Sequence, residues 1–338
     1  MEILLFALNA VLPILTLIGL GYLLKRVGFL NEEFLRVGNK FVFRIALPAL
    51  LYYTIYSISS FSTINWSVIV YSVMAILILF TLGLMIANLL IPDKKQKGVI
   101  IQAIFRSNYA IIGIPLAQAL GGTPAIAVVA LVSAIAVPLM NVLAVIALSL
   151  YIKEDDAKLE MEDTLLKIVK NPLIIGVFLG LVTLAIRSFI PVDPETLIPV
   201  FTLEHNLTFL YTAIKWMGQI ASPFALIILG GTFEFFVIKS LGKQIAIGTL
   251  SRVILAPLIT LSLAVYLSSK TSFFHFTSVD YPAFIALLAS PTAVSSAIMA
   301  KEMQNDEKLA VQLVVWSTIS SIVSIFIIVV IFRSAGLL

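Results

Sequence analysis

Apolar stretches of about 20 residues or more alternate with short polar segments along the whole chain. A helix needs about 20 mostly apolar residues to cross the hydrocarbon core of a bilayer. The pattern therefore predicts an all-α integral membrane protein with ten spanning helices, whose ends are defined to within a few residues. The predicted ranges are 3–24, 40–58, 66–91, 98–120, 124–152, 171–190, 214–238, 242–268, 281–301 and 309–333.

Composition excludes a water-soluble fold. Of the 338 residues, 60% are hydrophobic and only 12% are charged, against about 25% charged in soluble domains. The absence of cysteine excludes disulfides and thiolate catalysis. No phosphate-binding loop, zinc-protease motif or nucleophile–base pair is present, so we expect no enzyme activity, no cofactor and no metal site. The net charge is +4. We place the excess Lys and Arg residues in loops at the surface of the lipid bilayer, so we expect no nucleic-acid partner.

The basic residues fall unevenly on the two sides of the predicted bundle. Fifteen of the 22 Lys and Arg residues lie in loops on one side, four lie on the other, and three lie within spans. Cytoplasmic loops carry the excess of Lys and Arg. The bias predicts a multi-pass protein of the cell inner (plasma) membrane with both termini outside.

The two halves of the chain resemble each other. Pro13–Gly21 (PILTLIGLG) is similar to Pro172–Gly180 (PLIIGVFLG), and Pro115 corresponds in position to Pro291. Because five helices is an odd number, the halves must have opposite orientation, which is typical of transporters. The predicted domains are a first five-helix repeat at 1–152, a cytoplasmic connecting loop at 153–170 and a second, inverted repeat at 171–338.

The fourth and ninth predicted helices are interrupted at equivalent places. Proline removes a helical hydrogen bond, and interrupted helices in corresponding positions indicate a transporter's binding site. We expect each second half-helix to begin near Pro115 or Pro291, with its positive end turned to a bound anion. A plain proline kink is the alternative, and it is the favoured reading for Pro48, Pro138 and Pro257. The polar candidates for substrate binding are Asn108, Ser290, Thr292, Ser295 and Ser296.

A resemblance to a known family runs through these segments. Asn108–Leu116 (NYAIIGIPL) resembles the N-x(4)-G-I-P-L stretch of the auxin efflux carrier family, and Ala289–Ala293 (ASPTA) with Ser295 resembles its ninth helix. The family includes plant PIN proteins and bacterial malonate and malate permeases. The resemblance implies a ten-helix fold like that of bile acid–sodium symporters. In that fold helices 4 and 9 are unwound and cross, and a scaffold half moves against a transport half.

The resemblance also bears on the site and the substrate. It adds Tyr109, Gly113, Ile114, Pro115 and Pro291 to the substrate-binding candidates. The chain lacks the long cytoplasmic loop of plant members, which favours the bacterial branch of the family. Auxin is therefore not the expected natural substrate. Family members are often dimeric, so a homodimer is also expected.

Charged residues inside predicted spans are functional candidates, because charge is costly in the membrane. Arg252 and Arg106 are candidates for binding a carboxylate, whereas we expect Arg44 to reach the cytoplasmic surface. Glu234 is a weak candidate for ion coupling, and a position at a helix end beside a basic residue is the alternative.

These observations predict a secondary transporter of a small organic anion, such as a malonate- or malate-like carboxylate, working by alternating access. The coupling ion is H+ or Na+, and the sequence leaves the substrate and the direction of transport open. The alternatives are a non-transporting membrane sensor with the same fold, an exporter of an auxin-like aromatic carboxylate, and a channel.

Overall fold

The computed structural model describes residues 2–57, 65–152, 170–192, 199–234 and 237–338. Side chains at 2–11, at 14 and at several positions between 110 and 134 fall outside this description. The first half contains α1 Glu2–Arg26, α2 Glu32–Phe41, the π-helical turn η1 Val42–Ala46, α3 Leu47–Tyr56, α4 Trp66–Leu90, α5 Lys94–Phe105 and α6 Tyr109–Ser149. The second half contains α8 Pro172–Ser188, α9 Leu203–Asn206, α10 Thr208–Thr232, α11 Ile238–Leu250, η3 Ser251–Leu255, α12 Ala256–Lys270, α13 Tyr281–Ala289, α14 Ser295–Glu302 and α15 Glu307–Ser334.

The helices lie close to the predicted ranges. Helix α6 is divided at Gly122, whose φ of 65° favours glycine, and this separates the predicted ranges 98–120 and 124–152. Helix α10, Thr208–Thr232, lies six residues earlier at both ends than the predicted range 214–238, so its first turns lie in a segment outside the predicted spans.

Five helical stretches in the described part of the chain are long and apolar enough to cross a membrane. These stretches are Trp66–Leu90, Pro124–Ser149, Thr208–Thr232, Ile238–Lys270 and Glu307–Ser334. The chain is thus a multi-pass membrane protein. Ten crossings, the inverted repeat and its domain boundaries stay predictions, and almost all of the connecting loop at 153–170 lies outside the described residues.

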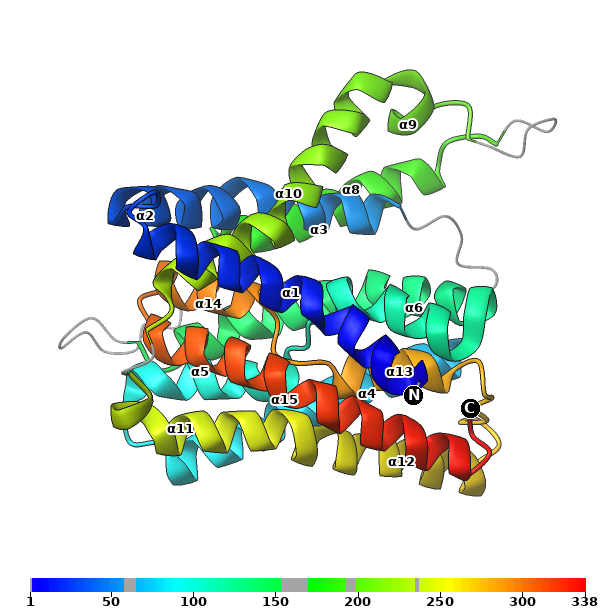
Figure 1. Cartoon of the computed structure of the whole chain (residues 1–338). Coiled ribbons are helices and arrows are strands. Elements are labelled where there is room, and N and C mark those ends of the chain that lie inside the picture. The colour runs from blue at the N-terminus through cyan, green and yellow to red at the C-terminus, as the bar shows by residue number, and fades with distance from the viewer. Residues whose placement is uncertain (1, 58–64, 153–169, 193–198, 235–236) are drawn as a thin grey trace.

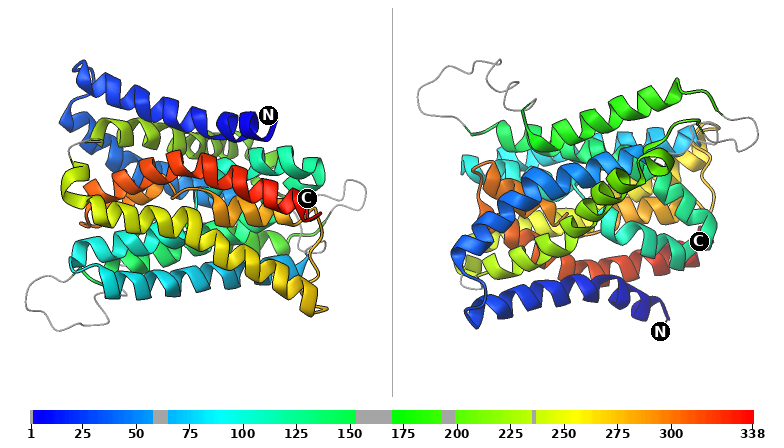
Figure 2. Two further views of the ribbon diagram at one scale, coloured as in Figure 1. Left: turned by 60° about the horizontal axis from the view of Figure 1, so that its bottom comes forward. Right: turned by 90° about the horizontal axis from the view of Figure 1, so that it is seen from above.

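The helices pack in two groups (Figures 1 and 2). One group, the α1–α10 layer, contains α1, α2, η1, α3, α8 and α10. The other, the inner bundle, contains α4, α5, α6, α11, η3, α12, α13, α14 and α15. Each group mixes helices from both predicted repeats, and the two ends of the described chain lie at the same end of the molecule (Figure 1).

Within the α1–α10 layer, two glycines bring α1 and α10 into backbone contact. A Cβ atom on Gly230 would lie 1.9 Å from the Ile18 carbonyl oxygen, and one on Gly21 would lie 2.1 Å from the Ile227 carbonyl oxygen. Helices in membranes associate through such close packing of small residues. These contacts join α1 to α10 through backbone atoms.

Each π-helical turn comes directly before a helix with proline at its second position. Pro48 follows η1 and Pro257 follows η3. Because proline has no N–H group, the carbonyl four residues earlier loses its helical partner. For Pro257 that carbonyl belongs to Val253 in η3, and the Ser324 hydroxyl of α15 donates a hydrogen bond to it. This hydrogen bond joins η3 to α15.

Candidate functional site

Two interrupted helices meet inside the inner bundle. The first break, Arg106–Asn108, separates α5 from α6, and the second, Ser290–Val294, separates α13 from α14. The breaks run antiparallel, with Ser107 opposite Thr292. The Asn108 N–H donates to the Pro291 carbonyl at 2.8 Å, and the Ala293 N–H donates to the Arg106 carbonyl at 3.1 Å. We call these two segments the paired breaks.

The sequence located one of the paired breaks correctly and misplaced the other. Pro291 lies in its break as predicted. Pro115 does not mark the first break: it lies inside α6, whose first helical residue is Tyr109. At this break the end of α5 is bonded by the other break, since the Thr292 hydroxyl donates to the Ala103 carbonyl at 3.2 Å.

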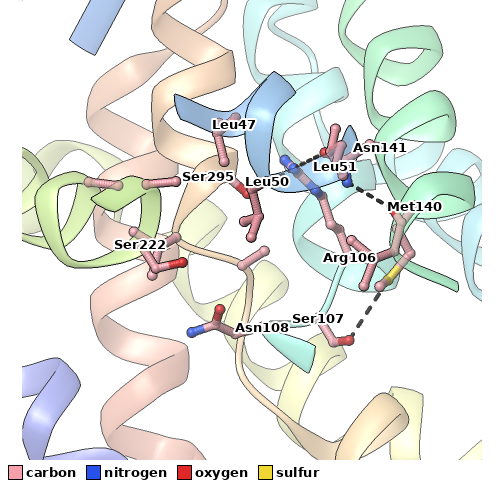
Figure 3. Close-up of a pocket in the computed structure, with 15 residues that line it drawn as sticks. Leu47, Leu50, Leu51, Arg106, Ser107, Asn108, Met140, Asn141, Ser222 and Ser295 are labelled. Atoms are coloured by element: carbon pink, nitrogen blue, oxygen red, sulfur yellow. Dashed lines mark hydrogen bonds between the residues drawn. The ribbon is translucent and has the colours of Figure 1, made fainter. Parts of the chain in front are cut away.

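A cavity of about 50 Å³ lies beside the paired breaks, between the α1–α10 layer and the inner bundle. The layer contributes Leu47, Leu50, Leu51, Ala221, Ser222 and Ala225. The inner bundle contributes Arg106, Ser107, Asn108, Val137, Met140, Asn141, Ala293, Val294 and Ser295 (Figure 3). The cavity thus has an apolar wall on one side and a mostly polar wall on the other.

Arg106 supplies the positive charge of this cavity, although its side chain is only 2% exposed. Its guanidinium donates to the Asn141 side-chain oxygen at 2.6 Å and to the Ser295 hydroxyl at 2.8 Å. It also contacts the Met299 sulfur and the Gln102 side-chain oxygen. All four partners are neutral, and the described residues show no ion pair to Arg106. A buried cation with neutral partners favours a bound anion.

Asn108 places an unused hydrogen-bond donor in the same cavity. Its side chain is 5% exposed, and its amide nitrogen has no hydrogen-bond partner in the described structure. Figure 3 shows Arg106 beside Asn141, with Asn108 and Ser222 in the wall of the same cavity. A buried polar group without a partner carries a free-energy cost of about 1–3 kcal/mol, which a ligand accepting its hydrogen bond would relieve.

Two helices begin at residues of the cavity wall. Asn108 directly precedes α6, and Val294 directly precedes α14. The first N–H groups of a helix lack helical partners and carry partial positive charge. Together with Arg106 they give the cavity wall the character of an anion site.

Five other predicted site residues are buried near the paired breaks but do not line the cavity: Tyr109, Ser290, Pro291, Thr292 and Ser296. The Tyr109 hydroxyl donates to the Val129 carbonyl at 3.3 Å. The hydroxyls of Ser290 and Ser296 are buried without a partner in the described structure. The Pro291 carbonyl accepts a hydrogen bond in the pairing, and Thr292 lies opposite Ser107. The side chains of Gly113, Ile114 and Pro115 lie outside the described residues.

Arg252 lies outside the cavity, contrary to its expected position at a carboxylate. Its side chain is fully buried, and its nitrogens donate to the carbonyls of Ser290 at 2.7 Å, Ile104 at 2.8 Å and Leu287 at 3.1 Å. These carbonyls lie at the C-terminal ends of α5 and α13, where helical partners are missing. Arg252 therefore supports the paired breaks from the side away from the cavity.

Two further charged residues lie at the surface. Arg44 in η1 is exposed, as expected for a side chain that reaches the surface. Glu234 lies two residues beyond the end of α10 and forms an ion pair of 3.0 Å with Lys308. Glu234 thus lies at a helix end beside a basic residue, which was the alternative to a role in ion coupling.

Sequence reasoning missed Asn141, Met140 and Ser222 in the cavity wall. Asn141 lies inside the predicted span 124–152, and an amide within an apolar span is a signal that could have identified it. Ser222 directly precedes Pro223. The apolar wall at Leu47, Leu50 and Leu51 has no such signal, because these residues resemble any other apolar side chain of a spanning helix.

Comparison with known proteins identifies the family. No curated protein matches the chain. A family model described as membrane transport protein matches residues 6–329. The match includes both paired breaks, the cavity and Arg252. The chain therefore belongs to this membrane transport family, the auxin efflux carrier or PIN-like family that its motifs resemble.

Proposed function

We propose that this chain is a secondary transporter that carries a small organic anion, of the malonate or malate type, through the cell inner membrane by alternating access. The substrate binds in the cavity beside the paired breaks, the coupling ion is H+ or Na+, and both termini face outside. The transport family supports the class of function. The observation that carries the substrate class is the buried Arg106 guanidinium, which has only neutral partners among the described residues, in a cavity whose wall also contains Asn108 with its unpartnered amide.

The chemistry of the cavity suits a carboxylate. A carboxylate accepts hydrogen bonds only and pairs with guanidinium through short, charge-assisted bonds. Arg106 supplies that charge, and the Asn108 amide and the start of α6 supply further donors. Malonate and malate carry a second carboxylate, for which the start of α14 and Ser295 offer donors on the same wall.

The position of the cavity suits alternating access. Its two walls belong to different helix groups, so movement of the α1–α10 layer against the inner bundle would open it to one side or the other. Small-molecule sites commonly have volumes of roughly 300–1,000 Å³, and a cavity of about 50 Å³ holds only a few water molecules. The cavity must widen to admit any of these acids, and a compact acid requires less widening than an aromatic one.

Uptake into proteoliposomes tests this proposal. Radiolabelled malonate, malate and an aromatic acid such as indole-3-acetate are offered under an imposed pH or sodium gradient. We expect saturable uptake of the compact acids by wild type and by Arg44→Gln, a control at an exposed arginine, and its loss in Arg106→Gln. Binding without flux would favour the sensor, flux that does not saturate would favour a channel, and uptake of only the aromatic acid would favour the auxin-like exporter.

A further inference from the structure

The Arg252 guanidinium fills a position lined by backbone carbonyls. Three of its nitrogens donate to three carbonyl oxygens, at 2.7, 2.8 and 3.1 Å. The oxygens come from both interrupted helices, Ile104 from α5 and Leu287 and Ser290 from α13 and its break. One side chain on η3 thus joins the C-terminal ends of two helices that are distant in sequence.

The surroundings of Arg252 favour a cation through dipoles alone. The C-terminal end of a helix carries partial negative charge, and two such ends converge here. The described acidic residues form no ion pair with Arg252. Arginine stays protonated in proteins, so the backbone carbonyls balance a full positive charge.

Backbone carbonyls at the ends of broken helices are also the ligands that bind Na+ in many secondary transporters. The Arg252 side chain is 0% exposed, so it leaves no room for a second cation among the same carbonyls. We propose that Arg252 is a resident cation, which takes the place of a monovalent metal ion at the paired breaks and makes them independent of added sodium. This inference rests on the proposed function only where it concerns transport.

The proposal predicts that removal of the guanidinium creates a need for a cation. Arg252→Ala leaves the carbonyls without a partner, and a monovalent ion can then occupy the vacated space. Arg252→Lys keeps a positive charge at this place. Arg44→Ala is the matched control, because Arg44 lies in the other π-helical turn but is exposed.

Thermal unfolding of the purified proteins tests this without any transport assay. Midpoints are measured in sodium, potassium or choline chloride at equal ionic strength, and with millimolar methylguanidinium chloride. For Arg252→Ala we expect a lowered midpoint that sodium or methylguanidinium raises, relative to choline, by roughly 5 °C in a saturable way. Wild type, Arg44→Ala and Arg252→Lys are expected to show no difference between sodium and choline.

Three results would overturn the proposal. The first is an Arg252→Ala variant whose lowered midpoint responds to no small cation, which would make Arg252 a plain structural cap. The second is a wild type with the same sodium response as Arg252→Ala. The third is an Arg252→Lys variant that depends on sodium or cannot be purified. This third result decides the matter even if Arg252→Ala does not fold, because it would show that the shape of guanidinium, and not its charge, is required.

Transport adds a separate readout. Of the two coupling ions proposed above, a resident Arg252 cation favours H+. If wild type carries one of the tested acids, its uptake under a pH gradient is expected to be unaffected by replacing sodium with choline, whereas uptake by Arg252→Ala is expected to depend on sodium. If wild type carries none of them, the proposed function fails, and the unfolding midpoints still decide the role of Arg252.

Discussion

The two buried arginines of the inner bundle differ in what surrounds them. On the cavity side of the paired breaks, Arg106 contacts side chains from α5, α6 and α14. On the opposite side, Arg252 contacts only backbone carbonyls among its described hydrogen bonds. Side-chain partners can rotate away when a ligand arrives, whereas carbonyls at helix ends cannot. The same residue type is therefore suited to binding on one side and to holding the helices together on the other.

The largest expected effect separates the two arginines by stability. Arg252→Leu leaves three buried carbonyls without a donor and fills the space with apolar atoms, so no ion can replace the guanidinium. We expect the free energy of unfolding to fall by about 3–5 kcal/mol, measured by denaturant titration in detergent. The comparison would fail if Arg106→Leu destabilised the protein as much as Arg252→Leu.

A second prediction separates the arginines by affinity. Arg106→Lys keeps the charge in the cavity but loses the planar fork that binds a carboxylate through two bonds. We expect KM for the transported acid to rise about tenfold, a change of roughly 1.4 kcal/mol, with an unchanged unfolding midpoint. An unchanged KM in this variant would show that the substrate does not contact Arg106.

Asn108→Ala tests whether the unpartnered amide binds a ligand while lowering the stability of the free protein. The substitution removes a buried donor that has no partner in the described structure, so we expect stability equal to or above that of wild type. Loss of one hydrogen bond to the substrate is expected to weaken binding by about 0.5–1.5 kcal/mol, measured as KM in proteoliposomes. A destabilised Asn108→Ala protein would indicate a structural role instead.

The smallest effects come from a matched pair of serines. The Ser295 hydroxyl accepts a bond from Arg106 on the cavity side, and the Ser317 hydroxyl accepts one from the Thr292 N–H on the other side. We expect Ser295→Ala to raise KM severalfold with little change in stability. Ser317→Ala is expected to lower stability by about 1 kcal/mol and to leave KM unchanged. A reversed pattern would contradict the assignment of the two sides.

The sequence predicted the helices and one break well, because both depend on local signals. Apolar stretches located the helices, and Pro291 located the second break. Pro115 misled, because α6 continues through this proline as its seventh residue. The break lies earlier in the chain, where Thr292 and Arg252, which are distant in sequence, donate hydrogen bonds to carbonyls near the end of α5.

The roles of the site residues depend on three-dimensional neighbours that hydropathy does not encode. Arg106 and Arg252 look alike in the sequence, since each is a lone cation within an apolar span. Only the folded chain shows that Ile104, Leu287 and Ser290 turn their carbonyls to Arg252. Asn141 and Ser222 also line the cavity only because the fold brings α6 and α10 next to the paired breaks.

The pairing of Ser107 with Thr292 has an evolutionary consequence. The two breaks are joined through backbone N–H and carbonyl groups, and such bonds place little demand on the identity of the side chains. Mutation can therefore alter Ser107, Asn108 or Ala293, which line the cavity, while the joint between the helices persists. A protein built in this way can acquire new substrates by small steps, without passing through forms that fail to fold.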